Sequence, residues 1–179
     1  KNKPLGRMIA LVGDAELDEG NVYECLQEGW KHDLRNVWWI IDYNRQSLDG
    51  IVFEKLFEKI INLFELMDWN VEILKYGSKL QKLKKSESGR KILKWIDDCP
   101  NDLFSALTYQ GGKAWRKTLL EVFSNDKNTL HLIQSFNDQE LNNLMTNLAG
   151  HDVESLEIAF SKYTNSDKPT CFICYTVKG

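Results

Sequence analysis

The sequence predicts an α/β protein with a doubly wound, mostly parallel sheet and helices on both faces. Four apolar runs lack the alternation of half-exposed strands, which favours strands that are covered on both faces. Helical patterns lie between the runs, and this order is typical of a parallel sheet joined by right-handed crossovers. With 179 residues, the chain is long enough for one domain with a hydrophobic core, which we expect to span residues 1–179.

The predicted strands are Arg7 to Val12, Val37 to Tyr43, Asn70 to Tyr76 and Pro169 to Val177. The last of these runs contains two cysteines with C-x-x-C spacing. Residues three apart on a strand point to opposite faces of the sheet. We therefore interpret Cys171 and Cys174 as buried strand residues rather than as a metal or redox pair.

Apolar residues with helical spacing predict helices between the strands. One pattern runs from Gly20 to Asp33 and another from Glu54 to Met67. Asn137 and Glu140 have the spacing of a capping box, and Asp152 is placed to cap a further helix. The stretch between the third and fourth strands contains no convincing strand pattern. We predict a helical insertion there, over about residues 77–136, before the last strand.

The composition excludes several classes of protein. A net charge of −3 provides no basic field for nucleic acid, so no nucleic-acid partner is expected. The longest apolar runs are strand-sized, far short of the roughly 20 residues of a membrane helix, so no membrane association is expected. Four cysteines in a chain of this length do not form a disulfide scaffold. These features favour a cytoplasmic protein.

Candidate ligand-binding residues follow the first two predicted strands. Asp14 comes directly after the first strand, and Asn44 and Gln46 come after the second, about thirty residues later. In an open parallel sheet, ligands bind beyond the carboxyl ends of the strands. Mg²⁺ takes about six oxygen ligands at about 2.1 Å, several of them from phosphates and water. A carboxylate, an amide oxygen and a backbone carbonyl from two strand ends meet the protein's share of that demand.

The first of these strand ends also offers phosphate donors. Backbone N–H groups are free at the start of a helix, and the turn from Gly13 to Glu16 precedes one. A glycine lets the backbone approach a phosphate closely. Taken alone, Asp14 is better explained as a helix cap, and Asn44 as a turn residue. Their occurrence together, on consecutive strands, favours a shared ligand site.

These two segments resemble the thiamine diphosphate fingerprint, whose usual form is Gly-Asp-Gly followed by Asn. Here they read Gly-Asp-Ala-Glu and, about thirty residues later, Asn-x-Gln-x-Leu-Asp-Gly. The chain resembles the homodimeric, bacterial-type pyruvate dehydrogenases from about Arg7 to Gly179. The other segments that carry the resemblance are Glu16 to Glu19, Trp69 to Val71, Tyr76 to Ser78, Gly150 to Asp152 and Thr176 to Gly179.

Transketolases share the fingerprint and the last two of these segments. Their segment between the Asn strand and the Gly-His-Asp helix is much shorter than the one in this chain. Here about a hundred residues separate Gly50 from His151. That length favours the pyruvate dehydrogenase type, and a transketolase-type ketol transfer domain is the alternative.

By position, the resemblance implies Mg²⁺ ligands at Asp14, Asn44 and the backbone carbonyl of Gln46. It also places Lys178 near the mouth of the active site, as a candidate catalytic residue, although a surface lysine at a strand end explains it equally well. The main catalytic groups are expected outside this chain. His151 is interpreted as a helix-start residue rather than a substrate contact.

The resemblance also implies that the thiamine diphosphate cofactor is bound by Gly13, Asp14, Ala15, Glu16 and Asn44. Ala15 departs from the fingerprint, which normally has Gly at this position. If the position requires φ > 0, alanine costs about 1 kcal/mol. If it does not, only a methyl group has to fit near a phosphate. A non-catalytic homologue is therefore a further alternative.

The resemblance implies oxidative decarboxylation of a 2-oxo acid such as pyruvate, with acyl transfer to lipoamide. The implied partners are a second subunit of a homodimer and a dihydrolipoyl acyltransferase component with its lipoyl group. In relatives, a glutamate that activates the cofactor comes from a second domain on the partner subunit, and this chain offers no candidate for that domain. We therefore expect a fragment of a larger enzyme that is inactive by itself.

Overall fold

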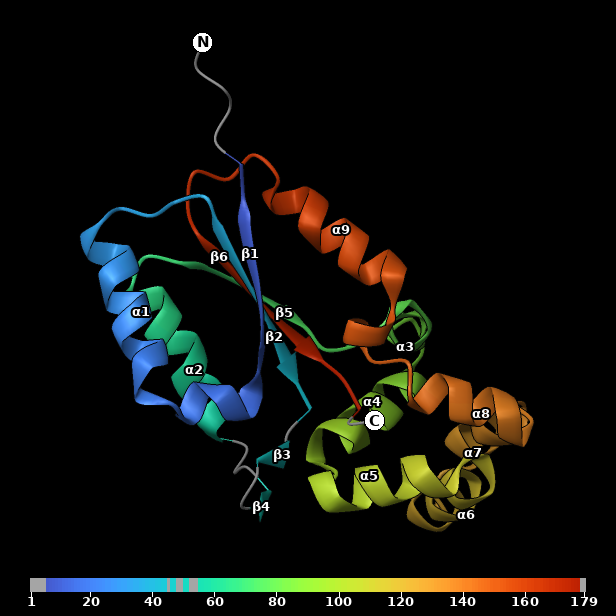
Figure 1. The fold of residues 1–179 in the computed structure, drawn as a ribbon. Coiled ribbons are helices and arrows are strands. Elements are labelled where there is room, and N and C mark those ends of the chain that lie inside the picture. The colour runs from blue at the N-terminus through green and yellow to red at the C-terminus, as the bar shows by residue number, and fades with distance from the viewer. Residues whose placement is uncertain (1–5, 45, 48–49, 52–54, 178–179) are drawn as a thin grey trace.

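The structure, a computed structural model, describes residues 6–44, 46–47, 50–51 and 55–177 (Figure 1). Its elements, in chain order, are β1 (Met8–Gly13), η1 (Asp14–Asp18), α1 (Gly20–Lys31), β2 (Val37–Tyr43), β3 (Gln46–Ser47), β4 (Gly50–Ile51), α2 (Lys55–Leu66), β5 (Asn70–Leu74), α3 (Ser78–Leu83), α4 (Glu87–Asp98), α5 (Asn101–Gln110), α6 (Gly112–Val122), α7 (Lys127–Gln134), α8 (Asp138–Met145), η2 (Ala149–His151), α9 (Val153–Tyr163) and β6 (Thr170–Tyr175). The predicted α/β class is confirmed, since a parallel sheet is flanked by helices.

The described part of the chain contains one four-stranded parallel sheet in the order β1-β2-β6-β5. A small antiparallel pair, β3 with β4, lies apart from it. β5 ends at Leu74, two residues before the predicted end. Beyond it Tyr76 forms an isolated antiparallel bridge with Leu148, so this segment leaves the sheet to pair with the chain before η2. β6 likewise ends at Tyr175 rather than at Val177.

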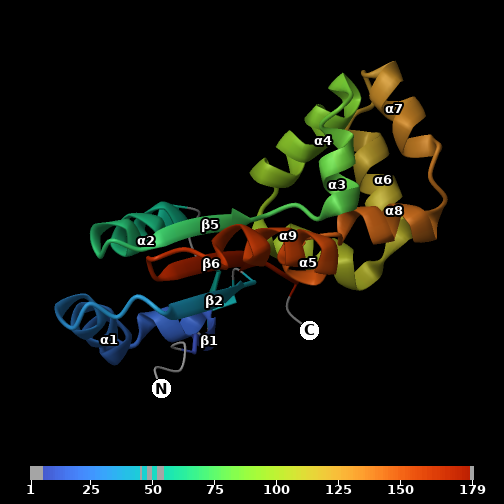
Figure 2. The same cartoon turned by 90° about the horizontal axis from the view of Figure 1, so that it is seen from above.

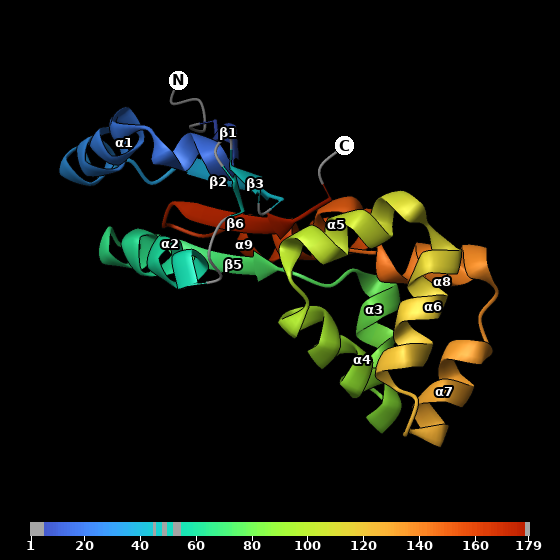
Figure 3. The ribbon, with the colours of Figure 1, turned by 90° about the horizontal axis from the view of Figure 1, so that it is seen from below.

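Helices cover both faces of the sheet, as predicted. α1 and α2 pack on one face and α9 packs on the other (Figures 1 and 3). Cys171 belongs to the core on the α1–α2 side and Cys174 to the core on the α9 side. The interpretation of these cysteines as buried residues on opposite faces is therefore confirmed. Burial, followed by the nearby charge of Asp42, raises the pKa of the Cys174 thiol to about 12.

The prediction that all strands are covered on both faces is wrong for β1. β1 is an edge strand of the described sheet, and the side chains of Met8, Ile9 and Leu11 are 68%, 56% and 74% exposed. The apolar stripe predicted for α1 is also only partly buried. Leu26 is buried, whereas Trp30 is 56% exposed.

Between β5 and β6 the described chain is helical. α3 to α8 form a group beside the sheet, past the carboxyl ends of its strands (Figure 2). Trp115 is fully buried in this group and stacks edge-on against Phe104. The predicted capping box at Asn137 and Glu140 is present at the start of α8. None of the helices described here is long and apolar enough to cross a membrane.

Candidate functional site

The candidate site lies where β1 and β2 end. Gly13 is the last residue of β1 and pairs in register with Asp42 of β2. Asp14 is the first residue of η1, directly after β1, and Asn44 is the residue directly after β2. η1 contacts both β2 and β3. The fold thus brings the segment that begins at Asp14 against β2, which Asn44 directly follows, and against β3, which begins at Gln46.

Asp14 is a buried residue with several other acidic residues around it. It is only 8% exposed, and its Oδ1 accepts the backbone N–H of Ala15 at 3.0 Å. Further carboxylates in or beside this turn belong to Glu16, Asp18, Glu19 and Asp42. Such a concentration of negative charge disfavours a pyrophosphate anion unless a cation lies between them.

The donor set fits a hard divalent cation that is shared with a ligand. No cluster of three or more His, Cys, Asp or Glu suited to holding a metal occurs among the described residues. A site built mainly from protein carboxylates is therefore not found in that part of the chain. Mg²⁺ is commonly held by one or two carboxylates, with phosphates and water completing its shell. A carboxylate, an amide oxygen and a carbonyl are consistent with this second arrangement.

The backbone at Ala15 is not strained. Among the described residues other than glycine, positive φ occurs only at Asp33 and Asp68. Ala15 lies inside η1, so its departure from the fingerprint carries no left-handed backbone cost. What remains is the space that its methyl group occupies. One of the predicted phosphate donors is also already engaged, because the Ala15 N–H is bonded to Asp14.

Gly13 has room for a side chain within the protein. Its φ is −72° and its ψ is 152°, which any residue adopts. A Cβ built on Gly13 would lie 3.7 Å from Oε1 of Glu16, an ordinary van der Waals contact. Neither the backbone nor the packing therefore requires glycine here.

A cavity of about 520 Å³ opens beside this turn. Its lining includes Gly13, Glu16 and Asp42 from the ends of β1 and β2, together with Gly150 and Thr176. Its remaining lining is mostly apolar and comes from the α9 side of the sheet: Leu11, Ile40, Leu156, Phe160 and Cys174. The carboxyl ends of the strands thus border a hollow with a polar rim.

Hydrogen bonds fix the end of β6 against β2. The Thr176 hydroxyl donates to Oδ1 of Asp42, and its backbone N–H donates to the Tyr43 carbonyl at 3.1 Å. The Val177 N–H donates to Nε2 of His151 at 2.9 Å. Asp42 and Thr176 are not among the ligand-binding residues predicted from the sequence. Their positions at adjacent strand ends were the available signal.

The other candidate residues are placed as follows. His151 ends η2 and does not start α9, whose cap is the next residue, Asp152. Its interpretation as a helix-start residue is therefore wrong, because it lies two residues before Val153, the first residue of α9. Gln46 pairs with Ile51 through the backbone of β3 and β4. Lys178 lies outside the described residues.

No family model matches the chain. Curated relatives named pyruvate dehydrogenase E1 component do match it. The protein from Buchnera aphidicola (subsp. Schizaphis graminum) is 29% identical over 100% of this chain and 20% of its own length. The Escherichia coli K12 protein is 25% identical over 96% and 19%, and that of Corynebacterium glutamicum is 23% identical over 95% and 18%.

The chain thus spans about a fifth of the length of the curated relatives it matches. The match covers both the strand-end segments and the helices between β5 and β6, because it includes nearly all of this chain. This chain is therefore similar, over nearly its whole length, to one segment of pyruvate dehydrogenase E1 components, which confirms the resemblance that its motifs indicate.

Proposed function

We propose that residues 1–179 form the Mg²⁺- and thiamine diphosphate-binding domain of a 2-oxo acid dehydrogenase, with pyruvate as the expected substrate. The helices over about residues 77–136 are an insertion in this domain. The observation that carries the proposal is the contact of η1, which begins at Asp14, with β2, which Asn44 directly follows, and with β3, which begins at Gln46. The relatives named pyruvate dehydrogenase E1 component support the class of enzyme.

In this proposal the chain anchors the cofactor through its diphosphate. Asp14, the side-chain oxygen of Asn44 and the carbonyl of Gln46 hold Mg²⁺, which neutralises the phosphates beside an acidic surface. Gly13, Ala15 and Glu16 line the diphosphate. When bound, thiamine diphosphate supplies the electron sink for decarboxylation, and the protein supplies its position. The disulfide of a lipoyl group on a dihydrolipoyl acyltransferase partner would serve as the two-electron oxidant, so that one of its sulfurs would take up the acyl group and the other would become a thiol.

The same site also fits a transketolase-type domain, because the fingerprint concerns the cofactor and not the substrate. The helical segment between β5 and η2 favours the dehydrogenase. A non-catalytic homologue was suggested by Ala15, but the unstrained backbone at that residue removes the main reason for it. A second subunit of a homodimer and further domains would supply the groups that this chain lacks.

Calorimetry with thiamine diphosphate tests the proposal. We expect binding to the chain in the presence of Mg²⁺, and its loss when EDTA removes the metal. Thiamine without phosphates serves as the control and should not bind, because the contacts are made to the diphosphate. The proposal would be contradicted if thiamine diphosphate still bound in the presence of EDTA and thiamine bound equally well.

An assay of the reaction separates the candidate enzymes. We expect the chain alone to turn over none of three substrates: pyruvate, 2-oxoglutarate and xylulose 5-phosphate. Supplied with the remaining domains of its enzyme, it should decarboxylate pyruvate. Turnover of xylulose 5-phosphate instead would support the ketol transfer alternative.

Gly13→Ala should lower cofactor affinity without lowering stability. An added methyl group meets only an ordinary contact in the protein, so the melting temperature should stay within about 2 °C of wild type. The same methyl group would occupy the space in which backbone meets phosphate, and we expect at least about tenfold weaker binding. Gly20→Ala is the matched control. Gly20 is the first residue of α1, and a Cβ added there meets nothing within 4 Å. Equal affinities in the two variants would show that no ligand approaches Gly13.

A further inference from the structure

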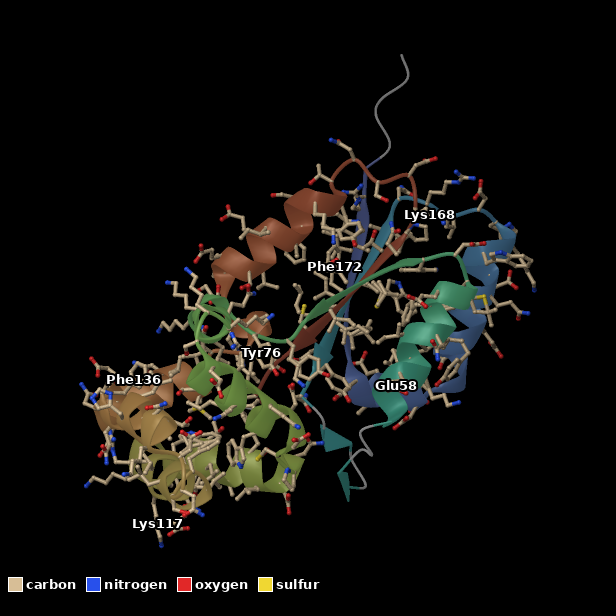
Figure 4. All side chains as sticks on the ribbon, turned by 180° about the vertical axis from the view of Figure 1, so that it is seen from behind. Glu58, Tyr76, Lys117, Phe136, Lys168 and Phe172 are labelled. Carbon is tan, nitrogen blue, oxygen red and sulfur yellow. The ribbon has the colours of Figure 1, made fainter. Side chains whose placement is uncertain are left out.

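A cluster of charged and aromatic side chains joins helix α4 to the carboxyl end of β5. Lys75 directly follows β5, and its Nζ lies 2.5 Å from Oδ1 of Asp97 in α4. The hydroxyl of Tyr76 donates to the same carboxylate oxygen. Figure 4 shows Tyr76 where the sheet meets the helices. Because the side chains of Lys75 and Asp97 are 27% and 45% exposed, the pair is partly shielded from water.

The phenol in this cluster acts as a neutral donor. Burial raises the pKa of Tyr76 well above its usual value, and the adjacent Asp97 carboxylate raises it further. The Tyr76 proton therefore stays on the phenol at every pH in the ordinary range. Lys75 and Tyr76 thus both serve Asp97 as donors, and α4 is tied to the chain just beyond β5 by two bonds to one carboxylate.

The cluster continues from Lys75 across the neighbouring strand ends. Its Nζ lies 5.3 Å from the ring centroid of Tyr175, the last residue of β6. The Tyr175 ring packs against the Tyr43 ring with centroids 4.9 Å apart, at an interplanar angle of 64°. Both tyrosines are buried, and they are partners in the register of β2 and β6. Tyr43 immediately precedes Asn44, so a continuous set of contacts runs from α4 to a candidate metal ligand.

The backbone before Asn44 is held from the same side. Thr176, which follows Tyr175, donates its N–H to the carbonyl of Tyr43 at 3.1 Å. A displacement of the end of β6, which carries Tyr175 and Thr176, would therefore disturb both the ring and the backbone of Tyr43. A cation placed over an aromatic face restricts where that ring lies, and here the cation is itself fixed by α4.

We propose that Lys75 and Asp97 are positioning residues for Asn44, so that helix α4 sets the affinity of the Mg²⁺–diphosphate site. This inference rests on the proposed function. Neither residue touches the ligand. Groups behind the ligands of a metal site commonly change its affinity by about 10- to 100-fold, because they orient the groups that coordinate the ion.

A second ion pair on the same strand provides the control. Nζ of Lys162 in α9 lies 2.7 Å from Oε2 of Glu72 in β5, and the two side chains are 58% and 23% exposed. This pair also fastens a helix to β5, but Glu72 lies within the strand rather than at its carboxyl end. Breaking it should therefore affect stability without moving the tyrosines beside Asn44.

The test compares Mg²⁺-dependent thiamine diphosphate binding in the wild-type chain and five variants by calorimetry. Asp97→Asn and Lys75→Met should each weaken binding about tenfold, and the double variant should be no weaker, because both remove the same interaction. Lys75→Arg keeps a cation over the Tyr175 ring and should restore binding to within about twofold. Glu72→Gln should bind within about twofold of wild type.

A ligand-free measurement accompanies the titrations. The side-chain amide resonances of Asn44 should shift in Asp97→Asn and stay in place in Glu72→Gln. Wild-type affinity in Asp97→Asn and Lys75→Met, with an unshifted Asn44 amide, would overturn the positioning role and leave the proposed function intact. Failure of the wild-type chain to bind thiamine diphosphate at all would overturn the proposed function, and the positioning role with it.

Discussion

Asp14→Ala should abolish Mg²⁺-dependent binding of thiamine diphosphate. The variant removes the only carboxylate of the three proposed metal ligands, and the remaining amide and carbonyl oxygens are neutral. We expect an affinity at least about a hundredfold lower, which corresponds to about 2.7 kcal/mol. The melting temperature of the ligand-free protein should fall only slightly, because removing one carboxylate reduces the repulsion within the acidic cluster. Calorimetric titration in the presence of Mg²⁺ measures the loss.

Asp18→Ala is the matched control for this variant. Asp18 lies in the same short helix and carries the same charge, but it is exposed, whereas Asp14 is buried. If the acidic turn acted only through its total charge, the two variants would weaken binding equally. A loss of affinity in Asp14→Ala but not in Asp18→Ala would identify Asp14 as a metal ligand. Equal losses in the two variants, or no loss in either, would contradict that assignment. Asn44→Ala should resemble Asp14→Ala with a smaller effect, because an amide oxygen is a weaker Mg²⁺ ligand than a carboxylate.

Asp152→Ala should be strongly destabilising. Asp152 is 7% exposed, and its carboxylate accepts four hydrogen bonds. Ser78 donates its backbone N–H and its hydroxyl, both at 2.7 Å, while the Asn147 side chain and the Ser155 N–H each donate at 3.0 Å. One side chain thus joins the starts of α3 and α9. Removing it leaves buried donors without an acceptor, and we expect a loss of about 3 kcal/mol in the free energy of unfolding.

That loss corresponds to a fall in melting temperature of about 6 to 12 °C for a chain of this size. Ser86→Ala is the comparison, because Ser86 caps α4 alone, through a single bond to the Gly89 N–H at 3.0 Å. A single cap is worth about 1 kcal/mol. Equal effects of the two substitutions on thermal unfolding would show that Asp152 is an ordinary cap and not a junction.

The contribution of Asp152 also predicts a pH dependence. Burial alone would raise the pKa of its carboxyl, but the four hydrogen bonds outweigh burial and hold the pKa below the usual range. A carboxyl with a lowered folded-state pKa stabilises the fold fully above its unfolded pKa of about 4. Stability should then decline as the pH falls below about 4. Asp152→Asn should lose this part of the acid sensitivity, which denaturation at several pH values would reveal.

The sheet was predictable because each of its strands coincides with a continuous apolar run in the sequence. β2 begins and ends at the residues expected, Val37 and Tyr43. The ends of β5 and β6 were not predictable, because Tyr76 and Val177 extend the apolar pattern two residues past the last ladder pairs. Tyr76 leaves the sheet for a bridge to Leu148, a contact between segments 72 residues apart (148 − 76) that local pattern does not encode.

The candidate site was predictable only in part. Sequence order and strand pairing were enough to bring the segments of Asp14 and Asn44 together at one edge of the sheet. Nothing local indicated that Thr176 would bond to Asp42, because that contact depends on β6 lying beside β2 rather than beside β1. The ion pair of Lys75 with Asp97 depends in the same way on where α4 packs.

The central claim is that one divalent ion joins this strand edge to a pyrophosphate group. Mn²⁺ can replace Mg²⁺ at oxygen sites, and its unpaired electrons broaden the ³¹P resonances of a phosphate that it coordinates. With thiamine diphosphate and a trace of Mn²⁺, we predict that the wild-type chain broadens both phosphorus resonances well beyond the same mixture without protein, and that Asp14→Ala does not. Equal broadening by the two proteins, or none by either, would contradict the account.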